Sequence, residues 1–251
     1  MRGSRLLLVL LALLAFAGTL LAQLPAGLVT GAVDDLIDPR SGLAVREPRG
    51  TLWRGTARLD LGSATVARVA WRFPERLWPP ALGVTIASPY GAAEARIAPA
   101  GTDALRAHID RLELSLAAAN RHLRGLGLDL SGRLTGQDVI VEVPLAGDPR
   151  VETVLRYSGG RNQYQVGADW YVAELPPLPV ELAAAGGRLT VRVTHEASPV
   201  LRLEVLPGGR YRLDVHEAAV RLTGHPWEVS ASGDDVVFSL EEALAAPGSL
   251  R

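Results

Sequence analysis

Residues 188–216 read RLTVRVTHEASPVLRLEVLPGGRYRLDVH, and this stretch decides the fold class. Apolar side chains recur at every second position, and most of the positions between them hold charged or hydroxyl side chains. Successive side chains of a β-strand point to opposite faces, so a period of two predicts strands with one apolar and one polar face. Pro207-Gly208-Gly209 separates two of the runs and is typical of a hairpin turn. The stretch therefore predicts half-buried, antiparallel strands.

The same alternation extends over the chain from about residue 50. Further runs of this kind occupy residues 57–61, 67–72, 112–116 and 139–145. Turn sequences such as Gly159-Gly160 and Gly186-Gly187 separate the runs. We expect roughly a dozen strands with few long crossovers, because short turns join neighbouring strands as hairpins. The expected fold class is mainly β, antiparallel and hairpin-connected.

Three segments depart from the alternating pattern. Ala117 to Arg124 is a candidate short helix that Gly125 would close, and Thr102 to Arg106 is a candidate single helical turn. Pro176-Pro177-Leu178-Pro179 interrupts the strands because proline cannot donate to a sheet ladder. This proline segment either divides the strand-rich part into two sections or forms an extended loop at a sheet edge, and we favour the loop.

The N-terminus carries the one long apolar run. Arg2 and Arg5 precede unbroken apolar sequence from Leu6 to Ala22, and three aspartates follow between residues 34 and 38. A helix over this run would be roughly 25 Å long, the short end of what spans a bilayer. Basic residues before the run and acidic residues after it orient the N-terminus toward the cytoplasm. The alternative is a signal peptide that is cleaved after Ala17 or Ala22.

In either case the body of the protein is exported, and the domain organisation follows. We expect a membrane-anchored protein with a cytoplasmic N-terminus and an exported body. The expected segments are a cytoplasmic tip at 1–5, a transmembrane anchor at 6–28, a membrane-proximal linker at 29–49, a periplasmic β-rich domain at 50–245 and a C-terminal tail at 246–251.

Composition excludes several kinds of chemistry. The chain has 251 residues, a formal net charge of −1, no cysteine, and 26 basic residues that are all arginine. Without cysteine there are no disulfides, thiolate metal sites or thiol nucleophiles. Without lysine there is neither Schiff-base chemistry nor a P-loop. The near-neutral charge also argues against nucleic acid as a partner.

Motifs for catalysis or metal binding are missing as well. The sequence has no HExxH, GxSxG, GxGxxG or P-loop pattern. The pairs Asp34-Asp35 and Asp234-Asp235 are typical of polar turns, because adjacent carboxylates on an extended chain point apart. Trp170-Tyr171 is either a ligand platform or one packed and one exposed ring. We expect no enzymatic activity, cofactor or metal, and we interpret the five histidines as surface residues: His108, His122, His195, His216 and His225.

The most distinctive segment runs from residue 48 to residue 73. It contains GTLWRGTA at residues 50–57 and AWRF at residues 70–73. Together with the N-terminal anchor, this segment resembles protein N of type II secretion systems, in which an anchor leads to a G-T-L-W-x-G-x-A motif and then to a tryptophan-bearing strand. The match is close from Gly50 to Ala57 and from Trp71 to Leu77, and it is loose beyond residue 100. The residues that carry the motif are Gly50, Thr51, Leu52, Trp53, Gly55, Ala57, Trp71 and Arg72.

The resemblance implies a non-enzymatic accessory subunit of the secretion machine, held in the inner membrane and working through contacts with other secretion-system subunits. The family's looser kinship with exported proteins of repeated amphipathic hairpins implies an elongated, curved sheet, and a sandwich is the alternative.

The residues of the motif can also be interpreted without the family. Gly50 and Gly55 flank the entry to a first strand, and the indole of Trp53 is expected to lie over nearby backbone, with Trp71 as its cross-strand partner. Packing is the favoured role of both tryptophans, and contact with a partner subunit is the alternative. If Trp53 is a buried core residue, Trp53→Ala should cost roughly 3 kcal/mol.

Two functions compete for the amphipathic strands, and an exported hydrolase ranks third for want of a catalytic set. In the first, the β domain engages other secretion subunits by sheet edges or an apolar patch. In the second, lipid is the partner: an apolar groove holds acyl chains and carries them across the periplasm. The two differ in whether the apolar faces close on each other or line an open groove.

Overall fold

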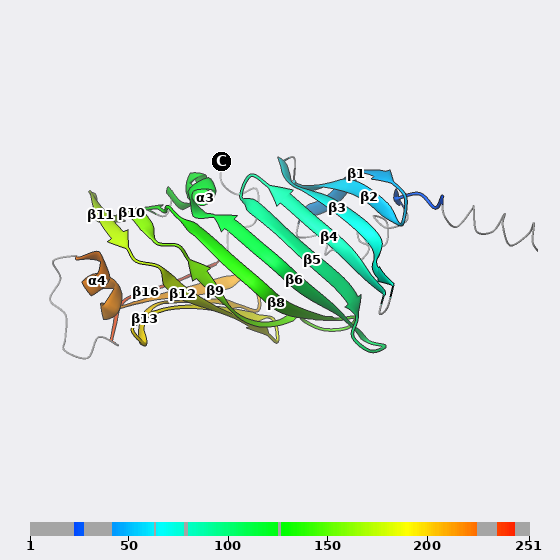
Figure 1. The fold of residues 1–251 in the computed structure, drawn as a ribbon. Coiled ribbons are helices and arrows are strands. Elements are labelled where there is room, and N and C mark those ends of the chain that lie inside the picture. The colour runs from blue at the N-terminus through cyan, green and yellow to red at the C-terminus, as the bar shows by residue number, and fades with distance from the viewer. Residues whose placement is uncertain are drawn as a thin grey trace, which may run out of the picture. The chain divides into compact units, whose positions relative to one another are not determined.

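The computed structural model describes residues 23–27, 42–62, 64–77, 80–124, 127–224 and 235–243. The chain divides into two compact units, residues 1–87 and residues 88–251 (Figure 1). Both units are built from antiparallel strands, which confirms the expected mainly β, antiparallel, hairpin-connected class. None of the described helices is long and apolar enough to cross a membrane. The expected anchor at 6–28 lies outside the described residues except for 23–27.

The first unit contains four consecutive strands, each paired with the next along the chain. The first strand, β1, begins seven positions before the expected start of the β-rich domain, inside the stretch expected as a linker. A small core forms where Ala26, Ala57 and Trp71 are buried together, with Val45 and Leu82 packed against them. The strands are β1 (Leu43–Gly50), β2 (Arg54–Leu61), β3 (Ala64–Leu77) and β4 (Pro80–Ser88), whose last residue falls in the second unit.

The second unit holds a larger sheet of nine strands among its described residues. In pairing order they are β5 (Gly91–Pro99), β6 (Ala104–Ser115), β8 (Arg133–Pro144), β9 (Arg150–Tyr157), β12 (Leu178–Ala185), β13 (Arg188–His195), β14 (Ser198–Leu206), β15 (Arg210–His216) and β16 (Val236–Ala243). Cross-strand partners share a face, and apolar partners face each other along most of this sheet.

A second, three-stranded sheet and two short helices gather at one end of the nine-stranded sheet (Figure 1, left). These elements are β7 (Leu128–Asp129), β10 (Gly160–Val166), β11 (Asp169–Leu175), α3 (Leu116–Leu123) and α4 (Glu217–Thr223). Helix α3 contacts β7, β10 pairs with both β7 and β11, and α4 contacts β11. We call this group of five elements the cap.

Buried polar side chains fix the cap to the sheet. The amide of Asn120 in α3 donates to the Leu130 carbonyl and accepts from the Leu130 N–H, both at 2.8 Å. Asn162 in β10 is 3% exposed, and its amide donates to the Tyr157 hydroxyl at 2.8 Å. Its carbonyl oxygen accepts the Ser131 N–H at 2.8 Å. The side-chain amides of Asn120 and Asn162 are thereby satisfied, as burial requires.

The core of the second unit lies against the cap. Its five buried members are Val139, Leu155, Tyr157, Leu178 and Val180, and partly buried residues from both helices and the neighbouring strands pack on them. We call the sheet face that carries these residues the inner face. The strand ends opposite the cap are more open, since Val143 is 40% and Leu145 62% exposed.

Several local expectations need correction. The helix expected from Ala117 to Arg124 is found as α3, but Thr102 to Arg106 forms no helical turn, because Ala104 already begins β6. Helix α4 was not expected. In the proline segment only Pro176 and Pro177 lie outside strands, and β12 starts at the buried Leu178.

Candidate functional site

The motif residues 50–57 build a tight turn between β1 and β2. Gly50 pairs with Gly55, and the Thr51 N–H donates to the Arg54 carbonyl at 2.8 Å. The Thr51 hydroxyl accepts the Arg54 N–H at 3.3 Å. Gly50 has a φ of +95°, and a Cβ there would collide with the Arg54 carbonyl oxygen. Glycine at this position is therefore required by the backbone.

Trp71 of β3 closes over this turn. It is 7% exposed and lies opposite Gly55, where a Cβ would overlap the indole ring. Its indole N–H is 3.2 Å from the carbonyl oxygens of both Thr51 and Leu52. Ala57 is buried in the same cluster. Six of the eight motif residues thus meet in one packed arrangement, which gives them a structural role: Gly50, Thr51, Leu52, Gly55, Ala57 and Trp71.

The other two motif residues lie nearer the surface. Trp53 is partly buried and stacks on Phe73, with ring centroids 5.8 Å apart and planes at 26°. The expectation that Trp53 covers Gly55 and pairs with Trp71 is therefore wrong, because Trp71 itself occupies the position opposite Gly55. Arg72 is exposed. Of these two residues, Arg72 is the more exposed.

The second feature is the inner face of the second unit, on which aliphatic partners form continuous rows. One row joins Leu155, Val180, Val193, Leu201, Val215 and Phe238. The next row joins Thr153, Leu182, Val191, Leu203, Leu213 and Leu240. Six strands at about 4.8 Å spacing make each row roughly 24 Å long.

The side chains of these two rows become more exposed from β9 toward β16. Leu155 and Val180 are buried, whereas Phe238 at the far end is 46% exposed. Among the described residues, the core cluster reaches as far as Val191 and Val193 of β13, and the inner face of β14 and β15 is only partly buried. The apolar face therefore neither closes on itself nor lies fully open. It continues from the capped core onto strands whose inner-face side chains are only partly buried.

The outer face of the same strands is charged. Arg192 pairs with Glu181 at 3.4 Å, and Arg212 with Asp214 at 3.1 Å. The hydroxyl of Ser239 donates to Asp214 at 2.6 Å. This hydrogen bond, followed by the neighbouring Arg212, holds the pKa of Asp214 below its usual range. The outer face is thus a self-paired polar surface, in contrast to the inner face.

One cluster on the outer face of β5, β6 and β8 escaped the sequence analysis. His108 Nε2 lies 3.3 Å from Asp138, and Arg96 contacts both His108 Nδ1, at 3.0 Å, and the carboxylate of Asp110. His108, Asp110 and Asp138 are possible metal ligands, and they lie together because strand pairing joins positions that are distant in sequence. Arg96 already supplies positive charge to Asp110, so the arrangement works as an ion-pair network that ties three strands together.

The remaining candidates from the sequence are resolved in part. Trp170 is 47% exposed, whereas Tyr171 stacks on Tyr164 with centroids 5.7 Å apart, so this pair has one outward and one packed ring. The acidic pair at 34–35 lies outside the described residues.

Comparisons of the chain with protein-family models, curated proteins and solved structures give no match.

Proposed function

We propose that this chain is a non-enzymatic, inner-membrane-anchored accessory subunit of a type II protein secretion system, and that it works by binding an extended segment of another subunit. The half-covered inner face of the second unit carries this proposal. That surface runs to β16, the last strand of the described sheet, where Phe238 is 46% exposed; Val236, which is 48% exposed, lies opposite His216 on the other face of this strand. A terminal strand with exposed apolar side chains suits the addition of a partner strand.

The motif in the first unit supports the same proposal from another direction. Six of the eight residues by which the chain resembles secretion protein N form one packed arrangement around Trp71. A sequence motif that proteins share for structural reasons is expected to form one packed unit of this kind. The exposed Arg72 beside this turn supplies a second point of contact with another subunit.

Secretion in the source cell tests this proposal. Deleting the gene should leave substrates of the secretion system in the periplasm, and the wild-type chain should restore their release. The double variant Val236→Asp/Phe238→Asp should restore little release. Ile140→Asp is the matched control because Ile140 is 50% exposed on the outer face, and it should restore release fully. Unchanged secretion after deletion contradicts the proposal.

A second candidate function is the binding of lipid acyl chains on the same inner face. The apolar character of the first row favours it, since its six side chains offer no polar group to a peptide backbone. The closed, capped end and the open opposite end also suit a linear apolar ligand.

Photochemical labelling separates the two candidates. A diazirine-bearing palmitate added to membranes that contain the full chain should label peptides of β13 to β15 if acyl chains bind there. Leu203→Glu should abolish this labelling, whereas Arg188→Glu, on the exposed outer face of β13, should not. Absence of inner-face labelling in the wild-type chain rejects the lipid function and leaves the subunit contact.

A further inference from the structure

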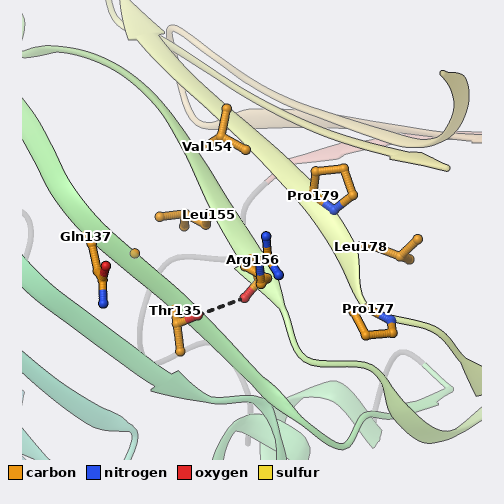
Figure 2. A pocket seen from close by; sticks show the side chains of 9 residues that line it. Thr135, Gln137, Val154, Leu155, Arg156, Pro177, Leu178 and Pro179 are labelled. Carbon is orange, nitrogen blue, oxygen red and sulfur yellow. Dashed lines mark hydrogen bonds between the residues drawn. The ribbon is translucent and has the colours of Figure 1, made fainter. Parts of the chain in front are cut away.

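Strands β8 and β9 separate in the middle of the second unit, and a pocket of about 690 Å³ opens there (Figure 2). The strands pair at Thr135 with Arg156 and again at Val141 with Val151, and their register shifts in between. Asp138, inside this interval, has a φ of +54°. A bulged residue of this kind bends its strand away from its neighbour, as happens next to many binding sites.

The pocket combines apolar and polar walls. Leu155 and Leu178, both members of the core, contribute to it, and Val154, which is 61% exposed, lies at its edge. Pro177 and Pro179 line the side toward β12 (Figure 2). The polar lining consists of the side chains of Thr135, Gln137 and Arg156. The volume falls in the range of small-molecule sites.

Arg156 is the one charged residue of this lining. Its cross-strand partners, Thr135 and Pro179, carry no charge. The carboxylates of the two neighbouring strands have other partners: Asp138 lies 3.3 Å from His108, Glu142 pairs with Arg106 at 2.7 Å, and Glu181 pairs with Arg192 at 3.4 Å. Within the part of the chain that the structure describes, Arg156 therefore has no ion-pair partner.

We propose that this pocket binds an acidic amphiphile, with its anionic head on Arg156 and its apolar body against Val154, Pro177 and Pro179. The guanidinium offers paired donors that match a carboxylate, and the Gln137 amide adds a donor from the opposite strand. The pocket has apolar walls beside a single cation. A purely polar anion would leave those walls exposed to water, so an anion with an apolar part is the better ligand. The residues proposed to hold the ligand, Arg156, Val154 and Pro179, lie on the outer face, so the site does not rest on the functions proposed above.

A photoreactive fatty acid tests the site in the full chain. The probe is a decanoic acid that carries a diazirine, used at a subsaturating concentration, with the label mapped by mass spectrometry. We expect label on peptides that contain residues 135–137, 154–156 and 177–179. Arg156→Gln should lower this labelling about tenfold, because a charge-assisted pair is lost. Arg150→Gln is the matched control, since Arg150 is exposed on the same strand but outside the pocket, and it should label as the wild type does.

Three further measurements test whether the pocket binds any anion or an acidic amphiphile in particular. The corresponding diazirine alcohol should label the pocket about tenfold less than the acid, and inorganic phosphate should not displace the acid. Val154→Glu, at a position that tolerates a polar side chain because it is exposed, should also reduce labelling by the acid. Equal labelling of Arg156→Gln and Arg150→Gln, equal labelling by acid and alcohol, or displacement by phosphate would each overturn the proposal.

Discussion

Replacing Trp71 should loosen the first unit and leave the second unaffected. The indole is 7% exposed, covers Gly55, and donates to the carbonyls of Thr51 and Leu52. Trp71→Phe keeps one ring of the side chain but removes the N–H donor. Trp71→Ala removes the whole ring system. The two variants therefore separate the hydrogen bond from the packing.

The expected magnitudes follow from these contacts. Trp71→Phe loses one hydrogen bond that spans two carbonyls, about 1 kcal/mol, and leaves a void where the second ring was, about 1 kcal/mol more. Trp71→Ala should cost about 4 kcal/mol, as other buried tryptophans do. Trp53→Ala should cost about 1.5 kcal/mol, less than its expected cost as a core residue, because Trp53 is only partly buried and loses mainly its stacking on Phe73.

Hydrogen exchange measured by mass spectrometry on the full chain gives the local result. Amides of β2 and β3 should lose protection in the order Trp53→Ala, Trp71→Phe, Trp71→Ala, while the peptides of β12 to β15 keep theirs because they belong to the other unit. If Trp71→Phe exchanges as the wild type does and Trp53→Ala exchanges fastest, the indole does not hold the motif together and the reasoning is refuted.

Three further predictions concern single contacts. Gly55→Ala should destabilise the first unit by about 2 kcal/mol in a urea titration, because the added Cβ overlaps the indole of Trp71; an unchanged midpoint would mean that the ring can move away. Ser239→Ala should cost about 1.5 kcal/mol at pH 7 by removing the main cause of the lowered Asp214 pKa. That contribution is present above the ordinary carboxyl pKa of about 4 and is lost as the pH falls through the lower folded value, so the two chains should converge once the pH is below that folded value; a constant difference would exclude this charge as the cause. Asn162→Ala should cost about 2 kcal/mol and speed exchange in β10, since it removes the acceptor of the Ser131 N–H and a hydrogen bond to the Tyr157 hydroxyl; unchanged exchange there would show that the cap does not depend on this amide.

The alternating period was sufficient to predict most strands and their amphipathic faces. Leu203 and Leu213, for example, lie opposite each other on the inner face as their alternation implies. Short hairpins fix which strands are neighbours, so the antiparallel class followed as well. Helix α4 could not be foreseen, because seven residues span only about two helical turns and give too little periodicity.

Features that depend on register were beyond the sequence. The register of β2 against β3 decides whether Trp71 lies opposite Gly55. A shift of that register by a single residue would move every side chain of the strand to the other face of the sheet. The pocket beside Arg156 and the cluster around His108 both lie where β-bulges change the pairing of neighbouring strands. An arginine that faces Thr135 and Pro179 rather than a carboxylate becomes recognisable only when the strand partners are known.

The accessibility of the inner face is the claim on which both proposed functions depend, and the absence of cysteine allows it to be measured without background. Single cysteines are introduced at Leu203 on the inner face, at the buried Val139, and at the exposed Arg192 on the outer face, and the full chain reacts with a small maleimide. The account predicts that Leu203→Cys reacts within about tenfold of Arg192→Cys, while Val139→Cys stays protected. Protection of Leu203→Cys equal to that of Val139→Cys would show that the apolar face is closed and would contradict the account.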